Sequence, residues 1–365
     1  MLNFAGDVVE RASLLFRATA AWMATPALTD LFSAVGASRP IAPSNSPPAG
    51  LDWLSSAHLE TLDRAAELER SADVAFNFRA GCDGQYRERS QATAAEFDDI
   101  TDARIVLLAA QLGLVTPRPP RYERYDQTLV LGGSYRSPLL RARYAAQLVE
   151  RGLDLGVLTF LGSPRAMIHE PPEVPIVESY APGATDEFDL MLGAATRELD
   201  LAARDTTFLC GCRSADGICP RWLGRHHELT ASIPPAFTHE RVAELVDPAG
   251  EIRGRVLSAS TSRPPYRPNT SDTFGLYARH ARLRPGQRIL VITTQMFVPF
   301  QSFEAGRCLY LPYGFEVDTV GLGAEWGDRP QTAPYLLQET LSAIRSGRQL
   351  LLAAADVLRR RSSGN

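Results

Sequence analysis

Short apolar runs alternate with stretches of helical period in the middle and later parts of the chain. Four of these runs are apolar almost throughout, which is typical of strands buried on both faces of a parallel sheet. They are QTLVLGG (127–133), LDLGVLTFLGS (153–163), GRVLSAS (254–260) and RILVITT (288–294), followed by a strand near 315–320. Helical segments separate them at 137–150, 185–203, 271–283 and 300–310. The alternation predicts a doubly wound, mostly parallel α/β sheet of the Rossmann-like type.

The flanking regions have a helical period. The first stretch mixes apolar and charged residues, which predicts an amphipathic core helix and neither a signal peptide nor a membrane span. Further helices are expected at 54–72 and 93–114, and a long one near the C-terminus. We predict a helical cap over 1–118, a ligand-binding α/β domain over 119–330 with a Cys-rich insertion at 205–250, and a C-terminal helix over 331–365. This last helix either packs on the sheet or forms the face of a homodimer.

Composition narrows the choice of partner. The chain has 365 residues, is 45% hydrophobic and carries a net charge of −4, so we expect a soluble, cytoplasmic protein. This net charge favours neither nucleic acid nor a membrane as partner, so we expect the partner to be a small-molecule ligand. All 38 basic residues are arginine, which excludes Schiff-base chemistry on lysine and a P-loop lysine.

The loops that follow the predicted strands carry the candidate binding residues. A strand end at Gly132 and Gly133, followed by a helix, can point backbone N–H groups at an anion, although simple chain reversal explains such a turn equally well. Asn269 and Thr270 precede another helix, where capping is the alternative to ligand binding. The full set of candidate binding residues is Gly132, Gly133, Ser134, Arg136, Gly162, Ser163, Asn269, Thr270, Thr293, Thr294 and Gln295. Arg141 and Arg143 add positive charge near the first turn.

Three residues are candidates for acid–base chemistry. Glu187 opens a predicted helix, where a carboxylate is also favoured by the helix dipole alone. His169 follows the second strand, and a surface histidine without a chemical role is the alternative. Asp272 follows Asn269 and Thr270, so it is either a catalytic group or part of a helix cap.

A segment rich in cysteine and histidine, CGCRSADGICPRWLGRHHEL, lies inside the predicted α/β domain. Its thiol and imidazole groups are of the kind that bind zinc in a tetrahedral site. The spacing is not one of the common paired patterns, so a cluster of reduced thiols and a disulfide remain alternatives. The candidate zinc ligands are Cys210, Cys212, Cys219 and His226.

The order of these motifs resembles the family of uncharacterised α/β proteins typified by SanA, ElyC and YdcF, over about residues 125–325. That family has a strand followed by Gly-Gly, a strand ending in Ser-Gly-Gly, a helix beginning with Glu-Ala, an Asn-Thr-x-Glu-Asn motif, and a Val-Thr-Ser strand followed by a His and an Arg. Matching places here hold Gly132-Gly133, Glu187, Asn269-Thr270 and Thr293-Thr294. Gly162-Ser163 and Asp272-Thr273 depart from the pattern, and MFVPFQ stands where the family has its His and Arg.

The resemblance to YdcF implies binding of S-adenosylmethionine or a similar nucleotide, whereas SanA and ElyC imply envelope work from a membrane anchor. Because no anchor is predicted, we expect a YdcF-like enzyme of specialised metabolism that uses S-adenosylmethionine as a transferase or lyase. The helical cap and the Cys-rich insertion would form the lid of its pocket. A phosphoester hydrolase and a non-catalytic nucleotide sensor are the alternatives, and the missing His and Arg favour the sensor.

Overall fold

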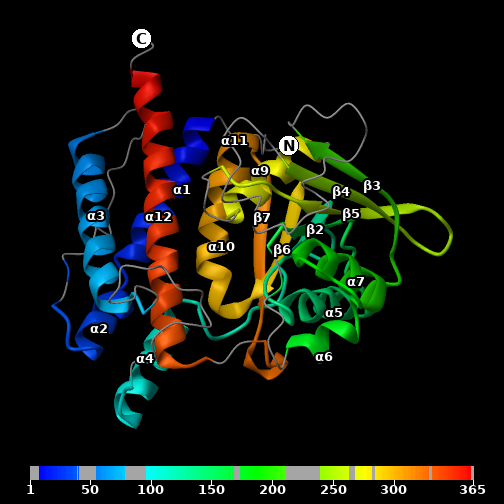
Figure 1. The fold of residues 1–365 in the computed structure, drawn as a ribbon. Helices are drawn as coiled ribbons and strands as arrows, with labels where there is room; N and C mark the ends of the chain where they lie inside the picture. Colours follow the sequence, from blue (N-terminus) through cyan, green and yellow to red (C-terminus); the bar gives the residue numbers. More distant parts are fainter. Residues whose placement is uncertain are drawn as a thin grey trace. The chain divides into compact units, whose positions relative to one another are not determined.

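The computed structural model divides the chain into two compact units, and its ribbon is drawn in Figure 1. The helical unit contains residues 1–118, 294–315 and 323–365, and the sheet unit contains residues 119–293 and 316–322. Within these ranges the structure describes residues 8–38, 40, 55–78, 96–165, 167, 173–210, 239–262, 268–281, 284–328 and 331–362.

The sheet unit is built on seven strands in the order β3-β4-β5-β2-β1-β6-β7 (Figure 1). β5, β2, β1 and β6 run parallel to one another, and Leu129 of β1 is in register with Thr159 on one side and Val291 on the other. The strands span β1 Gln127–Leu131, β2 Val157–Gly162, β3 Ala202–Cys210, β4 His239–Val246, β5 Ile252–Ser258, β6 Arg288–Thr294 and β7 Glu316–Leu322. The order β5-β2-β1-β6-β7 follows the doubly wound pattern, so the predicted fold class is confirmed.

Helices between the strands cover this sheet. α5 and α7 pack against each other, α5 along β1 and α7 along β2 and β5, while α9 packs on β2 and β5. These helices span α5 Ser137–Glu150, α6 Glu173–Glu178, α7 Glu187–Leu199 and α9 Thr270–His280. The helix predicted over 185–203 is shorter in the structure, because Asp200 adopts a left-handed conformation (φ 55°) that ends α7 before β3 begins.

An antiparallel hairpin at the sheet edge was not predicted from the sequence. β3 pairs with β4 and β4 pairs with β5, each antiparallel, so two strands extend the parallel sheet. They lie in the segment predicted as a Cys-rich insertion. The insertion therefore begins and ends as part of the central sheet.

The helical unit has its own apolar core. Phe16 of α1 and Phe32 of α2 are fully buried. The centre of the Phe32 ring lies 4.6 Å from the centre of the Phe76 ring at the end of α3. The long C-terminal helix was predicted, and α12 packs against α1, α3, α4 and α10. The helices span α1 Val8–Met23, α2 Pro26–Ala34, α3 Ser56–Phe76, α4 Asp99–Gln111, α10 Val298–Ala305, α11 Leu311–Tyr313 and α12 Ala333–Ser362.

The helices of this unit have ends that differ from those predicted, and α3 extends to Phe76 where 72 was expected. α4 begins at Asp99 because the Asp98 side chain accepts a hydrogen bond from the Thr101 N–H at 2.9 Å and caps the helix. The helix predicted over 300–310 is composite, since α10 ends at Ala305 and a π-helical turn continues it over Gly306–Tyr310.

Candidate functional site

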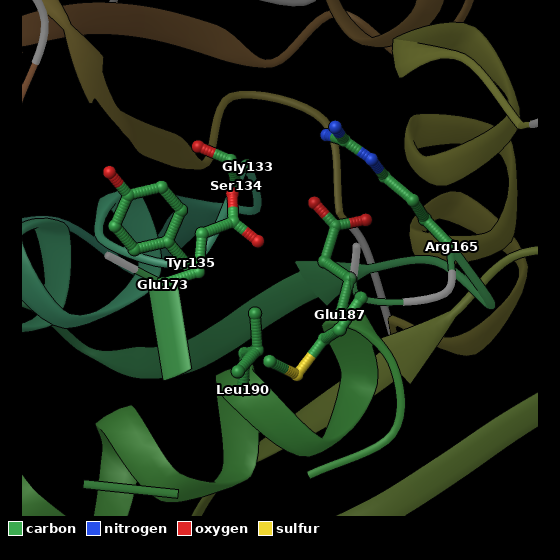
Figure 2. Close-up of a pocket in the computed structure, with 8 residues that line it drawn as sticks. Gly133, Ser134, Tyr135, Arg165, Glu173, Glu187 and Leu190 are labelled. Carbon is green, nitrogen blue, oxygen red and sulfur yellow. The ribbon is translucent and has the colours of Figure 1, made fainter. Parts of the chain in front are cut away.

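A small pocket that is open to solvent lies where β1 and β2 end, on the side of the sheet where doubly wound folds bind their ligands (Figure 2). Its walls come from the turn after β1, the loop after β2 and the first turns of α6 and α7, all within the sheet unit. The lining residues are Gly133, Ser134, Tyr135, Arg165, Met167, Glu173, Glu187 and Leu190. The sequence-predicted residues Gly133, Ser134 and Glu187 are thus brought together.

Glu187 is the first residue of α7 and is 9% exposed. Figure 2 shows its carboxylate and the Arg165 guanidinium pointing into the same part of the pocket. Glu173, from the start of α6, provides a second carboxylate in the lining. The pocket therefore presents groups of both charges to a ligand.

The loop after β2 fixes the orientation of Glu187. Ser163, which is 4% exposed, donates a hydrogen bond from its hydroxyl to Oε2 of Glu187. The Arg165 N–H donates to the Ser163 oxygen at 3.3 Å, and the Glu187 N–H donates to the Arg165 carbonyl at 3.0 Å. Ser163, Arg165 and Glu187 therefore hold one another in place through backbone and side-chain hydrogen bonds.

The first glycine of the turn after β1 makes room for this carboxylate. A Cβ atom on Gly132 would lie 2.5 Å from Oε1 of Glu187 and 2.6 Å from the Leu161 carbonyl oxygen. A Cβ atom on Gly133 would lie 2.7 Å from the Ser137 Cβ. The Gly-Gly pair is therefore required by close packing, and a negative charge of the protein already lies beside it.

The arginines that the sequence places near this turn have different roles. Arg141 is 2% exposed and donates to the Leu131 carbonyl at 2.9 Å and to the Gly132 carbonyl. Arg143 pairs with Glu198 at 2.9 Å, and Arg136 lies 5.8 Å from the centre of the Tyr135 ring. The cation of the pocket lining is instead Arg165, which follows the predicted binding residue Ser163 by two positions.

Tyr180 is hydrogen-bonded to a residue of the pocket wall. Its hydroxyl donates a hydrogen bond to the Tyr135 carbonyl at 2.5 Å. Burial raises the pKa of Tyr180, and the negative charge of Glu187 raises that pKa further. The phenol therefore stays protonated and keeps its hydrogen bond to Tyr135.

The start of α7 is held by a buried ion pair with the edge hairpin. Asp186 caps the helix by accepting hydrogen bonds from the N–H groups of Phe188 and Asp189, at 3.1 and 3.3 Å. Its other oxygen pairs with Arg241 of β4, whose guanidinium lies 4.2 Å from the centre of the Phe188 ring. No sequence pattern indicated this pair, because its partners are 55 residues apart.

The residues predicted around α9 form a helix cap. Asn269 accepts a hydrogen bond from the Asp272 N–H at 3.1 Å, and Asp272 accepts one from the Asn269 N–H at 2.9 Å. Asp272 also accepts from the Ser262 N–H at 3.2 Å, and Thr270 is the first residue of the helix. This is the capping alternative that the sequence left open, and none of the three lines the pocket.

The residues predicted at the end of β6 are buried. Thr293 is fully buried, and the Thr294 hydroxyl donates to the Asp328 carboxylate within the helical unit. The Gln295 amide donates to the Gly113 carbonyl at 2.7 Å in the same unit. The Thr294 hydroxyl and the Gln295 amide nitrogen therefore serve local structure in that unit.

The zinc hypothesis falls largely outside the described residues. Cys212, Cys219 and His226 lie outside them, as does His169. Cys210 ends β3 in register with His239, and its side chain is not described. Within the described ranges, no three His, Cys, Asp or Glu side chains are grouped so that they could hold a metal ion.

Among the helices that the structure describes, none combines the length and the apolar run needed to cross a bilayer.

The chain is similar in sequence to three mycobacterial proteins. It is 32% identical over 253 residues to a protein of Mycobacterium bovis and to its counterparts in two strains of Mycobacterium tuberculosis, all three described as uncharacterized proteins. The match covers 68% of this chain and 65% of the length of each relative. No family model and no solved structure matches the chain, so the resemblance to the YdcF-like family stays a prediction.

Proposed function

We propose that this pocket binds a small molecule that carries both a positive and a negative charge, with S-adenosylmethionine or a related adenosine-bearing molecule as the ligand. The observation that carries the proposal is the position of the Glu187 carboxylate, which accepts a hydrogen bond from Ser163. The Arg165 guanidinium lines the same pocket. A protonated amine or a sulfonium group would lie against Glu187, and a carboxylate against Arg165.

The charges of the lining favour this class over a phosphoester. Glu187 lies beside the turn that would otherwise accept a phosphate, and Glu173 adds a second negative charge to the same lining. A phosphate would be repelled by carboxylates in a partly closed site, where charge interactions are stronger than in bulk water. S-adenosylmethionine carries a sulfonium, an ammonium and a carboxylate, so it offers groups complementary to both charges of the lining.

Isothermal titration calorimetry with S-adenosylmethionine and ATP tests the proposal. We expect S-adenosylmethionine to bind more tightly than ATP, and Glu187→Gln to weaken it about tenfold or more, because a hydrogen bond to a charged group contributes roughly 1.5–3 kcal/mol. Arg165→Gln should weaken binding similarly. Glu150→Gln and Arg151→Gln, at the exposed end of α5, are matched controls and should bind as the wild type does.

Either of two results would overturn the proposal: a wild-type protein that ignores S-adenosylmethionine, or a folded Glu187→Gln variant that binds it unchanged. S-adenosylhomocysteine, which lacks the sulfonium charge, identifies the group that Glu187 contacts. A large loss of affinity indicates the sulfonium, and equal affinity indicates the ammonium. Mass spectrometry of the bound ligand after incubation separates an enzyme, which converts it, from a sensor, which releases it unchanged.

A further inference from the structure

We propose that Arg241 is a positioning residue for the Glu187 carboxylate, which makes the edge hairpin of β3 and β4 part of the ligand site. The inference deepens the proposed function and rests on it only where ligand affinity is concerned. Its basis is the buried ion pair between Arg241 of β4 and Asp186, the residue that immediately precedes Glu187.

The residues that flank Glu187 in the first turn of α7 are all held by buried contacts or hydrogen bonds. Asp186 is fully buried and accepts two backbone N–H groups of the turn as well as the Arg241 guanidinium. Asp189 accepts hydrogen bonds from both the N–H and the hydroxyl of Thr185, at 2.8 Å each, and lies 3.9 Å from Arg241. Phe188 is buried under the same guanidinium.

Glu187 is therefore directed into the pocket by the residues on both sides of it. Its own backbone N–H is bonded to the Arg165 carbonyl, so the turn is attached to the loop after β2 as well as to β4. A small rotation of this turn would move the carboxylate out of its present position, in which it contacts the Ser163 hydroxyl and lies beside Gly132. The direction of Glu187 depends on both attachments.

Arg241 has a particular role because the Asp186 carboxylate is out of contact with water. The exposed fraction of the Arg241 side chain is 6% and that of Asp186 is 0%. Without its cationic partner this buried acid keeps its proton to a higher pH, rotates toward solvent or draws in water. Each of these responses disturbs the cap from which α7, and with it Glu187, begins.

The experiment reads the environment of Glu187 directly, without a ligand. The protein is labelled with ¹³C-carboxyl glutamate, and the Glu187 resonance is assigned by its absence in Glu187→Gln. Ser163→Ala defines the resonance of a Glu187 that has lost its hydrogen bond. We expect Arg241→Met to move the resonance toward that of Ser163→Ala, and Arg241→Lys to give an intermediate position. Affinity for S-adenosylmethionine should fall about tenfold in Arg241→Met.

Two controls separate positioning from a general loss of stability. Leu245→Ala removes a fully buried side chain from the same strand, β4, and should lower stability while leaving the Glu187 resonance in place. Arg253→Met removes an arginine that is 55% exposed and paired with Asp247, and should change neither.

A folded Arg241→Met variant with the wild-type Glu187 resonance would overturn the inference. If that variant does not fold, Arg241→Lys is used in its place. A wild-type Glu187 resonance in Arg241→Lys would also overturn the inference, and an intermediate resonance supports it. A resonance that moves as expected in a protein that does not bind S-adenosylmethionine supports the positioning role and refutes the proposed ligand.

Discussion

The carboxylate of Glu187 occupies space that exists only because residue 132 has no side chain. Gly132→Ala would place a Cβ atom 2.5 Å from Glu187 Oε1 and 2.6 Å from a backbone carbonyl oxygen. Because the strand carbonyl cannot move freely, we expect a loss of roughly 1–3 kcal/mol in the free energy of unfolding. We also expect weaker ligand binding, since Glu187 must turn aside. Urea denaturation and calorimetry measure the two effects.

The same substitution elsewhere provides the matched control for Gly132. Gly275 lies inside α9, and an added Cβ atom would meet only the Arg279 guanidinium, at 3.8 Å. Gly275→Ala should therefore stabilise the protein by about 0.5–1 kcal/mol, because alanine is the better helix former. Equal effects of the two substitutions would mean that the close approach at Gly132 is not what constrains that position.

Asp186 should make stability depend on pH near neutrality. Burial raises the pKa of Asp186 to about 7, because the cost of desolvation exceeds the attraction of Arg241. The native protein then keeps a proton that the unfolded chain releases near 3.8. The stabilising contribution of this proton is complete below that value and is lost as pH rises to about 7.

Asp186→Asn tests this dependence while preserving a side-chain oxygen that caps α7. We expect urea midpoints measured from about pH 4 to pH 8 to fall less steeply with rising pH than in the wild type. Asp205→Asn, at a position that is 75% exposed, is the control and should keep the wild-type slope. An unchanged slope in Asp186→Asn would show that another group titrates in this range.

The sequence could predict part of the site at the level of residues. Gly132, Gly133, Ser163 and Glu187 were identified because strand-end glycines and helix-start carboxylates occur in local patterns, and the structure brings all four together. Their actual relation was not predictable, since the carboxylate takes the place proposed for an anion. Arg241 carries no local pattern, because its role depends on strand pairing across a long separation in sequence.

The elements of the parallel sheet were the most predictable, for a physical reason. Strands buried on both faces are continuous apolar runs, as in β1, where all five residues are buried. Edge strands lack this signal. β3 reads AARDTTFLC and is largely exposed over its first half, while its partner β4 begins at His239, far along the chain. Pairing of this kind comes from tertiary structure and not from local propensity.

Helix ends were predictable where proline marks the start of the helix and less so elsewhere. The predicted helix 137–150 coincides with α5, which has a proline at its start. The C-terminal end of α7 depends on the left-handed backbone of Asp200, a conformation that non-glycine residues seldom adopt and that no pattern in the sequence announces. The π-helical turn after α10 is likewise without a sequence signal.

At the scale of the whole molecule, residues distant in sequence complete each compact unit. α12 comes from the end of the chain and supplies Ile344 and Leu351 to the core that also contains Phe16 and Phe32. Ion pairs join α12 to α3 as well, including Arg348 with Glu69 at 2.9 Å. Since these side chains are partly exposed, we expect packing to contribute far more than charge to holding α12.

Two substitutions in α12 separate the contribution of packing to stability from that of charge. The affinity of both variants for S-adenosylmethionine then tests whether the helix contributes to the ligand site. Ile344→Ala should lower the free energy of unfolding by roughly 2–5 kcal/mol, and Arg348→Met by about 1 kcal/mol or less. Because every residue that lines the pocket belongs to the sheet unit, both variants should bind S-adenosylmethionine with wild-type affinity at temperatures where they remain folded. Weaker binding by folded Ile344→Ala would instead show that the helical unit contributes to the ligand site, and would direct the search for missing contacts to its residues.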